Sequence, residues 1–220
     1  MLFKDRTAAG QRLAKDLKQY ANRPDVIVLA LPRGGVPVAY HVARELNAPL
    51  DVWLVRKLGV PGREELAMGA IASGGTRILN EEVVKMLSLP EEDINRVAAK
   101  EQRELERREK AYRGDRPPQE LSDRTVILVD DGLATGASMH AAAVALRQHN
   151  PKQIIAAVPV SAPETCNELQ VEVDEIICSE TPKPFLAVGL WYDKFDQTTD
   201  QEVRDLLERS ADRQTANSTQ

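Results

Sequence analysis

A glycine-rich turn with two acidic residues in front of it is the part of the sequence best suited to chemistry. The segment TVILVDDGLATGAS, residues 125–138, takes an apolar run into Asp130 and Asp131 and then into a turn rich in glycine and hydroxyl groups. A helix beginning after such a turn has unpaired backbone N–H groups and partial positive charge at its N-terminus, which favours phosphate. Gly132 and Gly136 let the backbone curl close to a ligand, because neither carries a Cβ. The segment therefore predicts a phosphate site.

The two carboxylates indicate what the phosphate is attached to. Ionised Asp130 and Asp131 can only accept hydrogen bonds, and ribose hydroxyls are donors, so a ribose 5-phosphate fits the segment. The alternative is a pair of acids that only caps the turn. A Walker A loop is excluded because Gly136 is followed by Ala137 and Ser138 and not by lysine. The segment LPRGGVPV, residues 31–38, lacks the glycine spacing of a dinucleotide site.

Short apolar runs place this turn at the end of a buried strand. They lack clean polar alternation, which is typical of parallel strands covered on both faces. The expected strands are Val26–Leu31, Leu50–Val55, Thr125–Val129, Gln153–Val160 and Glu175–Cys178. The expected helices are Val36–Leu46, Glu81–Leu87, Glu91–Tyr112, Thr135–His149, Pro163–Leu169 and Asp200–Leu207. Alternating strands and helices predict an α/β fold with a parallel sheet flanked by helices.

Two regions interrupt this alternation. Arg56–Gly75 is rich in glycine, proline and charge, which predicts a mobile loop with one short strand at Met68–Ser73. Pro90–Arg113 is a charged helix with a narrow stripe of apolar or small residues, and we expect it to lie on the domain or against a second subunit. The stripe consists of Ile94, Ala98, Leu105 and Tyr112.

The run VILVDDGLATGASM resembles the PRPP-binding motif of the type I phosphoribosyltransferases, and the surrounding chain supports the resemblance over about residues 20–200. The resemblance implies a type I phosphoribosyltransferase-like sheet with a flexible loop and a C-terminal hood. It also implies that Asp130 and Asp131 bind the ribose hydroxyls and act in catalysis. The 5-phosphate would be bound by Leu133, Ala134, Thr135, Gly136, Ala137 and Ser138.

The same resemblance assigns three further segments. Pro32–Gly35 is similar to the family's pyrophosphate loop, with its strained and often cis peptide bond, so Arg33, Gly34 and Gly35 would bind pyrophosphate; the alternative is an ordinary turn. Arg56–Gly75 corresponds to the catalytic loop, where Arg56, Lys57 and Arg63 would neutralise departing pyrophosphate, unless they are plain surface cations. The hood, about residues 181–199, would stack a base on Phe185, Trp191 and Tyr192, and a core role is equally open for each aromatic.

The reaction implied is transfer of the phosphoribosyl group of PRPP to a nitrogenous base, with release of pyrophosphate. Mg²⁺ would be the cofactor, held mainly by PRPP and not directly by protein ligands. The alternative is a regulatory protein that binds PRPP or a nucleotide without turnover. Some 6-oxopurine enzymes of the family have aspartate where this chain has Ala134, so the resemblance does not specify the acceptor base. A hydrolase acting on a phosphoribosyl compound would need a metal cluster or nucleophile motif that the sequence lacks.

Composition limits the remaining possibilities. The 220 residues fit one domain over 1–210 with a frayed tail at 211–220, and the net charge of -5 argues against nucleic-acid binding. No apolar stretch is long enough to span a bilayer, and the N-terminus does not resemble a signal peptide. Cys166 and Cys178 are expected to be reduced thiols, so we expect a cytoplasmic protein. A homodimer stays open.

Overall fold

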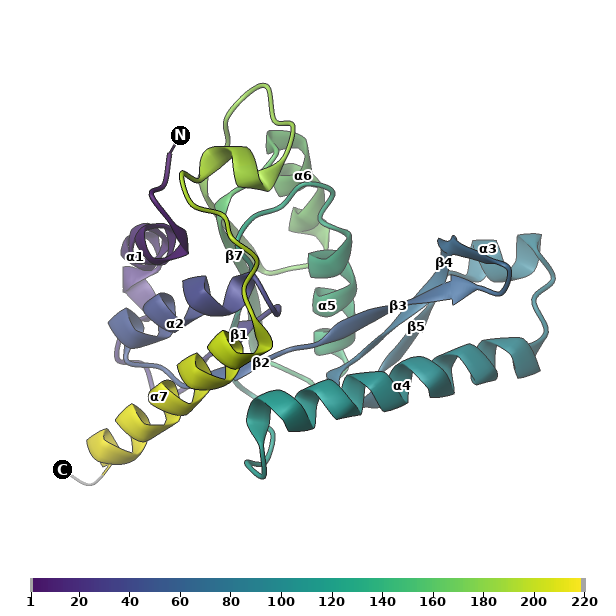
Figure 1. Cartoon of the computed structure of the whole chain (residues 1–220), viewed down its shortest axis with the longest axis horizontal. Coiled ribbons are helices and arrows are strands. Elements are labelled where there is room, and N and C mark those ends of the chain that lie inside the picture. The colour runs from purple at the N-terminus through teal and green to yellow at the C-terminus, as the bar shows by residue number, and fades with distance from the viewer. Residues whose placement is uncertain (1, 219–220) are drawn as a thin grey trace.

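The computed structural model describes residues 2–218 and contains a five-stranded parallel sheet at its centre (Figure 1). The strand order is β2-β1-β6-β7-β8, and β1 and β6 pair in register from Val26 opposite Thr125 to Ala30 opposite Val129. The strands are β1 (Val26–Ala30), β2 (Leu50–Val52), β6 (Thr125–Val129), β7 (Gln153–Val160) and β8 (Glu175–Glu180). The predicted α/β class and all five predicted strands are confirmed.

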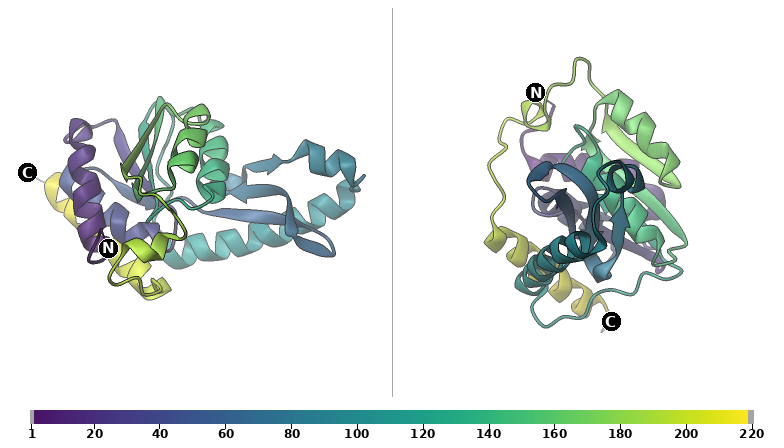
Figure 2. Two further views of the ribbon diagram at one scale, coloured as in Figure 1. Left: turned by 90° about the horizontal axis from the view of Figure 1, so that it is seen from above. Right: turned by 90° about the vertical axis from the view of Figure 1, so that its right-hand side faces the viewer.

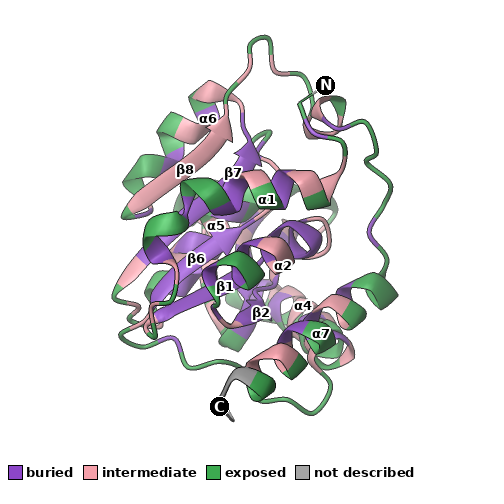
Figure 3. Cartoon of the chain, turned by 90° about the vertical axis from the view of Figure 1, so that its left-hand side faces the viewer, coloured by how far each residue is buried: buried purple, intermediate pink, exposed green. Residues whose placement is uncertain are grey.

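Helices cover both faces of this sheet, and β1, β2, β6 and β7 are therefore buried on both sides. One face packs against α1 (Arg6–Asp16), α2 (Gly35–Leu46) and α7 (Asp200–Ser218), and the other against α5 (Ala137–Arg147). Along β1, Val28 faces the first group while Ile27 and Leu29 face α5, as the alternation of a strand requires. Figure 3 shows the central strands buried beneath α1 and α2.

The predicted mobile loop is wrong in its main part. Residues 55–79 form a second, antiparallel sheet of β3 (Val55–Val60), β4 (Arg63–Ala72) and β5 (Arg77–Leu79), followed by α3 (Glu81–Met86). We call residues 55–86 the arm, because they extend away from the parallel sheet (Figures 1 and 2). The glycines and charged side chains that indicated a loop lie in the hairpin turn and on faces of the strands that do not pack on the core.

The charged helix α4 (Glu91–Arg113) runs along the arm and reaches α7. Its predicted stripe is confirmed, since all four stripe residues are buried. We expected α4 to lie either on its own domain or against a second subunit, and it lies on its own domain. The homodimer stays a prediction. Near the C-terminal end of α4, Tyr112 donates a hydrogen bond of 2.8 Å to Asp200 at the start of α7. This contact ties α4 to α7, the helix that follows the hood.

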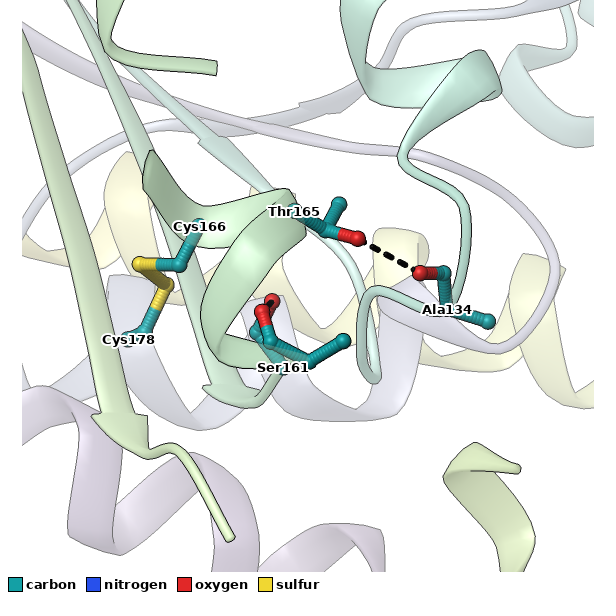
Figure 4. Close-up of a disulfide and its surroundings, with 6 residues drawn as sticks. Ala134, Ser161, Thr165, Cys166 and Cys178 are labelled. Atoms are coloured by element: carbon teal, nitrogen blue, oxygen red, sulfur yellow. Dashed lines mark hydrogen bonds between the residues drawn. A yellow bond between two sulfur atoms is a disulfide. The ribbon is translucent and has the colours of Figure 1, made fainter. Parts of the chain in front are cut away.

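Two further predictions are wrong. Cys166 on α6 (Pro163–Glu168) and Cys178 on β8 form a disulfide and are not free thiols (Figure 4). Sequence spacing alone could not pair them, because a helix and a strand bring them together. The tail predicted to fray at 211–220 instead continues α7 to Ser218, and residues 219–220 lie outside the described residues. Among residues 2–218, no helix is long and apolar enough to cross a membrane.

Candidate functional site

The predicted phosphate turn connects the end of β6 to the start of α5. Gly136 is the residue before α5 and has a left-handed backbone, with φ of 68°, and a Cβ there would come within 2.7 Å of a Thr165 methyl group. The Thr165 hydroxyl donates a 2.7 Å hydrogen bond to the carbonyl of Ala134 (Figure 4). Thr165 of α6 therefore anchors the turn, and the shape of the turn depends on glycine at position 136.

Five of the six predicted phosphate-binding residues lie in the turn or at the start of α5 without a contact that rules out their predicted role, which stays a prediction. Ala134, Thr135, Ala137 and Ser138 are exposed at the N-terminus of α5, and Gly136 sets the curvature. Leu133 is the exception. Its N–H donates to the carbonyl of Val160 at 3.0 Å and its side chain is buried, so Leu133 supports the turn and has no N–H left for a phosphate.

The predicted pyrophosphate loop packs directly on the carboxylates. The Pro32–Arg33 peptide bond is cis, in agreement with the family resemblance. A Cβ on Gly34 would lie 2.1 Å from Oδ2 of Asp131, and a Cβ on Gly35 would lie 2.7 Å from the carbonyl oxygen of Val129. Both glycines are needed for this approach, because any side chain would push the loop away from the end of β6. The ends of β1 and β6 thus bring the loop and the acids together.

Asp131 is held by several groups at once. Arg6 donates to its Oδ2 from Nε at 2.8 Å and lies at the same distance through Nη2. The hydroxyl of Tyr192 donates to the carbonyl oxygen of Asp131 at 2.6 Å. The N–H of Asp131 donates to Oδ1 of Asp130 at 2.8 Å. These contacts fix both the backbone and the side chain of Asp131.

Burial dominates the electrostatics of the two acids. Burial, and then repulsion from Asp131, raises the pKa of Asp130 well above its ordinary value. Burial also raises the pKa of Asp131, against the opposing effect of the Arg6 charge. Burial and the nearby Asp131 charge raise the pKa of Tyr192, so its hydroxyl stays a donor. Perturbed carboxylates of this kind are typical of functional sites.

The two predicted catalytic cations, Arg56 and Lys57, do not lie together at this site. Arg56 contacts Glu101 of α4 at 2.5 Å, so it is part of the packing between the arm and α4. Lys57, the next residue along β3, points to the other face of the arm, as strand geometry requires. It donates to the carbonyl of Glu65 and lines a hollow of about 470 Å³ beside Ser138 of α5. In this arrangement Arg56 is paired with Glu101 and its catalytic role stays a prediction, whereas Lys57 lies next to the phosphate turn.

The aromatic residues of the hood divide between core and surface roles. Tyr192 is only 2% exposed and packs on Phe3, with ring centroids 5.5 Å apart, so it offers no face to a base. Phe185 stacks on Trp191 with centroids 6.1 Å apart and the planes 27° from parallel. Of the two roles left open for Tyr192, the structure has the core role, because its ring completes a small core between the N-terminus and the hood.

A second hollow, of about 420 Å³, opens in front of the acids. Sequence reasoning missed part of its lining, because no motif marks those residues. It is lined by Arg6, Arg33, Gly34, Asp131, Phe195, Gln197 and Thr198. Arg33 stands 3.6 Å from Asp200, so the pyrophosphate loop is also linked to α7. The site thus joins the N-terminus, the pyrophosphate loop and the end of the hood.

Comparisons with known proteins agree with this geometry. A family model described as phosphoribosyl transferase domain matches residues 3–187, and the chain belongs to this family. A protein of Mycobacterium tuberculosis, found in strains CDC 1551 and H37Rv and provisionally named as a phosphoribosyl transferase, is 44% identical over 209 residues, which are 95% of this chain and 47% of that protein. The chain therefore spans about half the length of the curated relatives it matches.

A solved structure resembles the fold over nearly its full length. The crystal structure of the protein TT1426 from Thermus thermophilus has a TM-score of 0.84 and 41% sequence identity, and the match covers 95% of this chain and 99% of that one. The parallel sheet flanked by helices is thus the fold of this phosphoribosyl transferase family.

Proposed function

We propose that this protein transfers the phosphoribosyl group of PRPP to a nitrogenous base and releases pyrophosphate. The observation that carries the proposal is the close packing of the pyrophosphate loop on Asp131, next to the phosphate turn. A ligand with a 5-phosphate, ribose hydroxyls and a pyrophosphate group would contact the phosphate turn, the acids and the pyrophosphate loop at once. Family membership supports the same reaction.

In this proposal the protein acts by positioning and by electrostatics. The exposed N-terminal turn of α5 would hold the 5-phosphate, and Asp131 would accept a hydrogen bond from a ribose hydroxyl. As the bond to pyrophosphate breaks, positive charge develops on the ribose, and a buried carboxylate placed beforehand stabilises that charge. Arg33, Gly34 and Gly35 would receive the departing pyrophosphate.

Magnesium fits this site as a cofactor bound mostly by the substrate. Mg²⁺ prefers oxygen ligands in an octahedron and often takes one or two carboxylates together with phosphates and water. Among the described residues, no group of three or more His, Cys, Asp or Glu side chains could hold a metal alone. Asp130 and Asp131 supply the carboxylate oxygens nearest the pyrophosphate loop. When bound, Mg²⁺ would neutralise charge on the pyrophosphate.

A second candidate function is supported by the arm. The segment expected to close over substrate as a lid is a hairpin, and Arg56 on it is paired with Glu101. A regulatory protein that binds PRPP without turnover needs no lid.

The predicted cytoplasmic location stays a prediction, and the argument for it from reduced cysteines is lost with the disulfide.

The test is a screen of purine, pyrimidine and pyridine bases with PRPP and Mg²⁺, following pyrophosphate release, together with calorimetric titration of PRPP. The control is the double variant Asp130→Asn and Asp131→Asn, which keeps the shape and removes the charge. We expect release with at least one base, and loss of turnover in the control. PRPP binding without release would favour the regulatory function, and absence of binding would refute both.

A further inference from the structure

We infer that Arg6, on the N-terminal helix, is a positioning residue of the ribose site that holds the carboxylate of Asp131 in place at the hollow beside the pyrophosphate loop. The inference rests on the proposed function and adds a residue outside the PRPP-binding motif. Arg6 and Asp131 are 125 positions apart in the sequence. Their pairing therefore depends on how the N-terminus folds over the site.

The guanidinium of Arg6 is fixed on three sides. Nε and Nη2 both contact Oδ2 of Asp131 at 2.8 Å. Nη1 donates to the carbonyl of Asp196 at 2.7 Å, and the guanidinium carbon lies 3.9 Å from the centre of the Phe195 ring. Only 12% of the Arg6 side chain and 14% of the Asp131 side chain are exposed. A solvent-exposed ion pair contributes little to stability, but a desolvated pair with an aromatic ring stacked on one face restricts the movement of both side chains.

The backbone that carries Arg6 is anchored to the hood. The N–H groups of Leu2 and Phe3 both donate to the carbonyl of Trp191, and the N–H of Asp193 donates to the carbonyl of Phe3. Asp5 caps the start of α1 by accepting a hydrogen bond from Ala8. The N-terminal segment and the hood are thus one packed unit, which brings Arg6 to the acid instead of leaving it in solvent.

Arg6 contacts only one oxygen of the acid. Both of its contacts with Asp131 go to Oδ2. In this geometry the arginine orients the carboxylate without occupying both of its oxygens, and that separates a positioning role from a contact that blocks the site.

The experiment compares Arg6→Gln with Arg6→Lys and with a matched control. The control is Arg23→Gln, because Arg23 also makes two contacts to one carboxylate, that of Asp25, and also lies over an aromatic ring, that of Tyr20. Its pair with Asp25 sits just before β1, at the opposite end of the strand from the site. PRPP binding with Mg²⁺ is measured by calorimetry. Thermal unfolding of the ligand-free proteins is measured for Arg6→Gln, for Asp131→Asn and for the double variant, which gives the coupling between Arg6 and Asp131.

We expect Arg6→Gln to weaken PRPP binding by roughly ten- to hundredfold, which is the loss of one charged hydrogen bond. Arg6→Lys should restore most of the binding, and Arg23→Gln should bind PRPP like the wild type although it loses a comparable ion pair. A loss of PRPP affinity in Arg6→Gln no larger than that in Arg23→Gln would overturn the inference. So would additive effects of Arg6→Gln and Asp131→Asn on thermal unfolding, because a positioning contact requires the two residues to be coupled. If the wild type fails to bind PRPP, the proposed function fails, and the coupling still decides whether Arg6 holds Asp131.

Discussion

The packing of Gly34 on Asp131 leads to a prediction with a defined size. In Gly34→Ala, the new Cβ would lie 2.1 Å from Oδ2 and 2.8 Å from Cγ of Asp131, which is closer than real Cβ contacts. The backbone of Gly34 has φ of -59° and ψ of -34°, so alanine adds no backbone strain. The carboxylate must therefore move, and in moving it loses its contacts with Arg6.

The cost follows from what is lost. Hydrogen bonds to a charged group contribute about 1.5–3 kcal/mol, and this pair is mostly buried, so we expect a loss of about 2 kcal/mol in unfolding free energy. For a chain of 150–250 residues, that lowers the melting temperature by roughly 4–8 °C. The displaced carboxylate also loses its ribose hydroxyl, so PRPP affinity should fall roughly ten- to hundredfold.

The assay is a double-mutant cycle read by thermal unfolding and by calorimetric titration of PRPP. In an Asp131→Ala background, the three atoms nearest to the new Cβ are no longer present, so Gly34→Ala should change stability very little. The reasoning is refuted if Gly34→Ala costs as much in that background as in the wild type. Wild-type PRPP affinity in the single variant would refute the assignment of Asp131 to the ribose.

Three further predictions concern other parts of the molecule. Asp130→Asn should stabilise the fold at neutral pH, because burial raises the pKa of Asp130 above its unfolded value: the contribution of Asp130 to stability is fully present below about pH 4 and is lost as the pH rises through the folded-state pKa. Urea unfolding across pH checks this, and parallel curves for variant and wild type would contradict it. Reducing the bond between Cys166 and Cys178, which are 12 residues apart, should cost about 3 kcal/mol, and an unchanged urea midpoint with a dithiol reductant would argue against the pairing. Arg56→Gln should lose its contact with Glu101 and about 1 kcal/mol or less of stability while keeping PRPP affinity, and a large loss of affinity by calorimetry would return Arg56 to the site.

The sequence predicted the parts of the fold that depend on local pattern. The strand before Asp130 and the turn after it combine an apolar run with glycine positions, and both follow from near neighbours in the chain. The apolar stripe of α4 was predicted for the same reason, since helical spacing alone defines it.

The parts that failed depend on partners distant in the chain. The arm resembled a loop because β3 and β4 carry charges and glycines, and their strand form depends on pairing with each other and on cover from α4 and α5. Arg6 carried no signal, because its role comes from Asp131 and Phe195, more than 100 positions away. The role of Tyr192 could not be decided, because an aromatic residue near a ligand site and one in a small core look alike in sequence.

The outermost strand, β8, has a consequence for how the protein behaves at high concentration. An unpaired strand edge can recruit a strand from another molecule, which is a route to aggregation. Glutamate stands at each end of β8: Tyr20 and Gln19 of the neighbouring segment contact Glu175, and Arg12 of α1 lies 3.6 Å from Glu180. An incoming strand would have to disturb these anchored charges. Negative charge at both ends of β8 therefore disfavours edge-to-edge association through this strand.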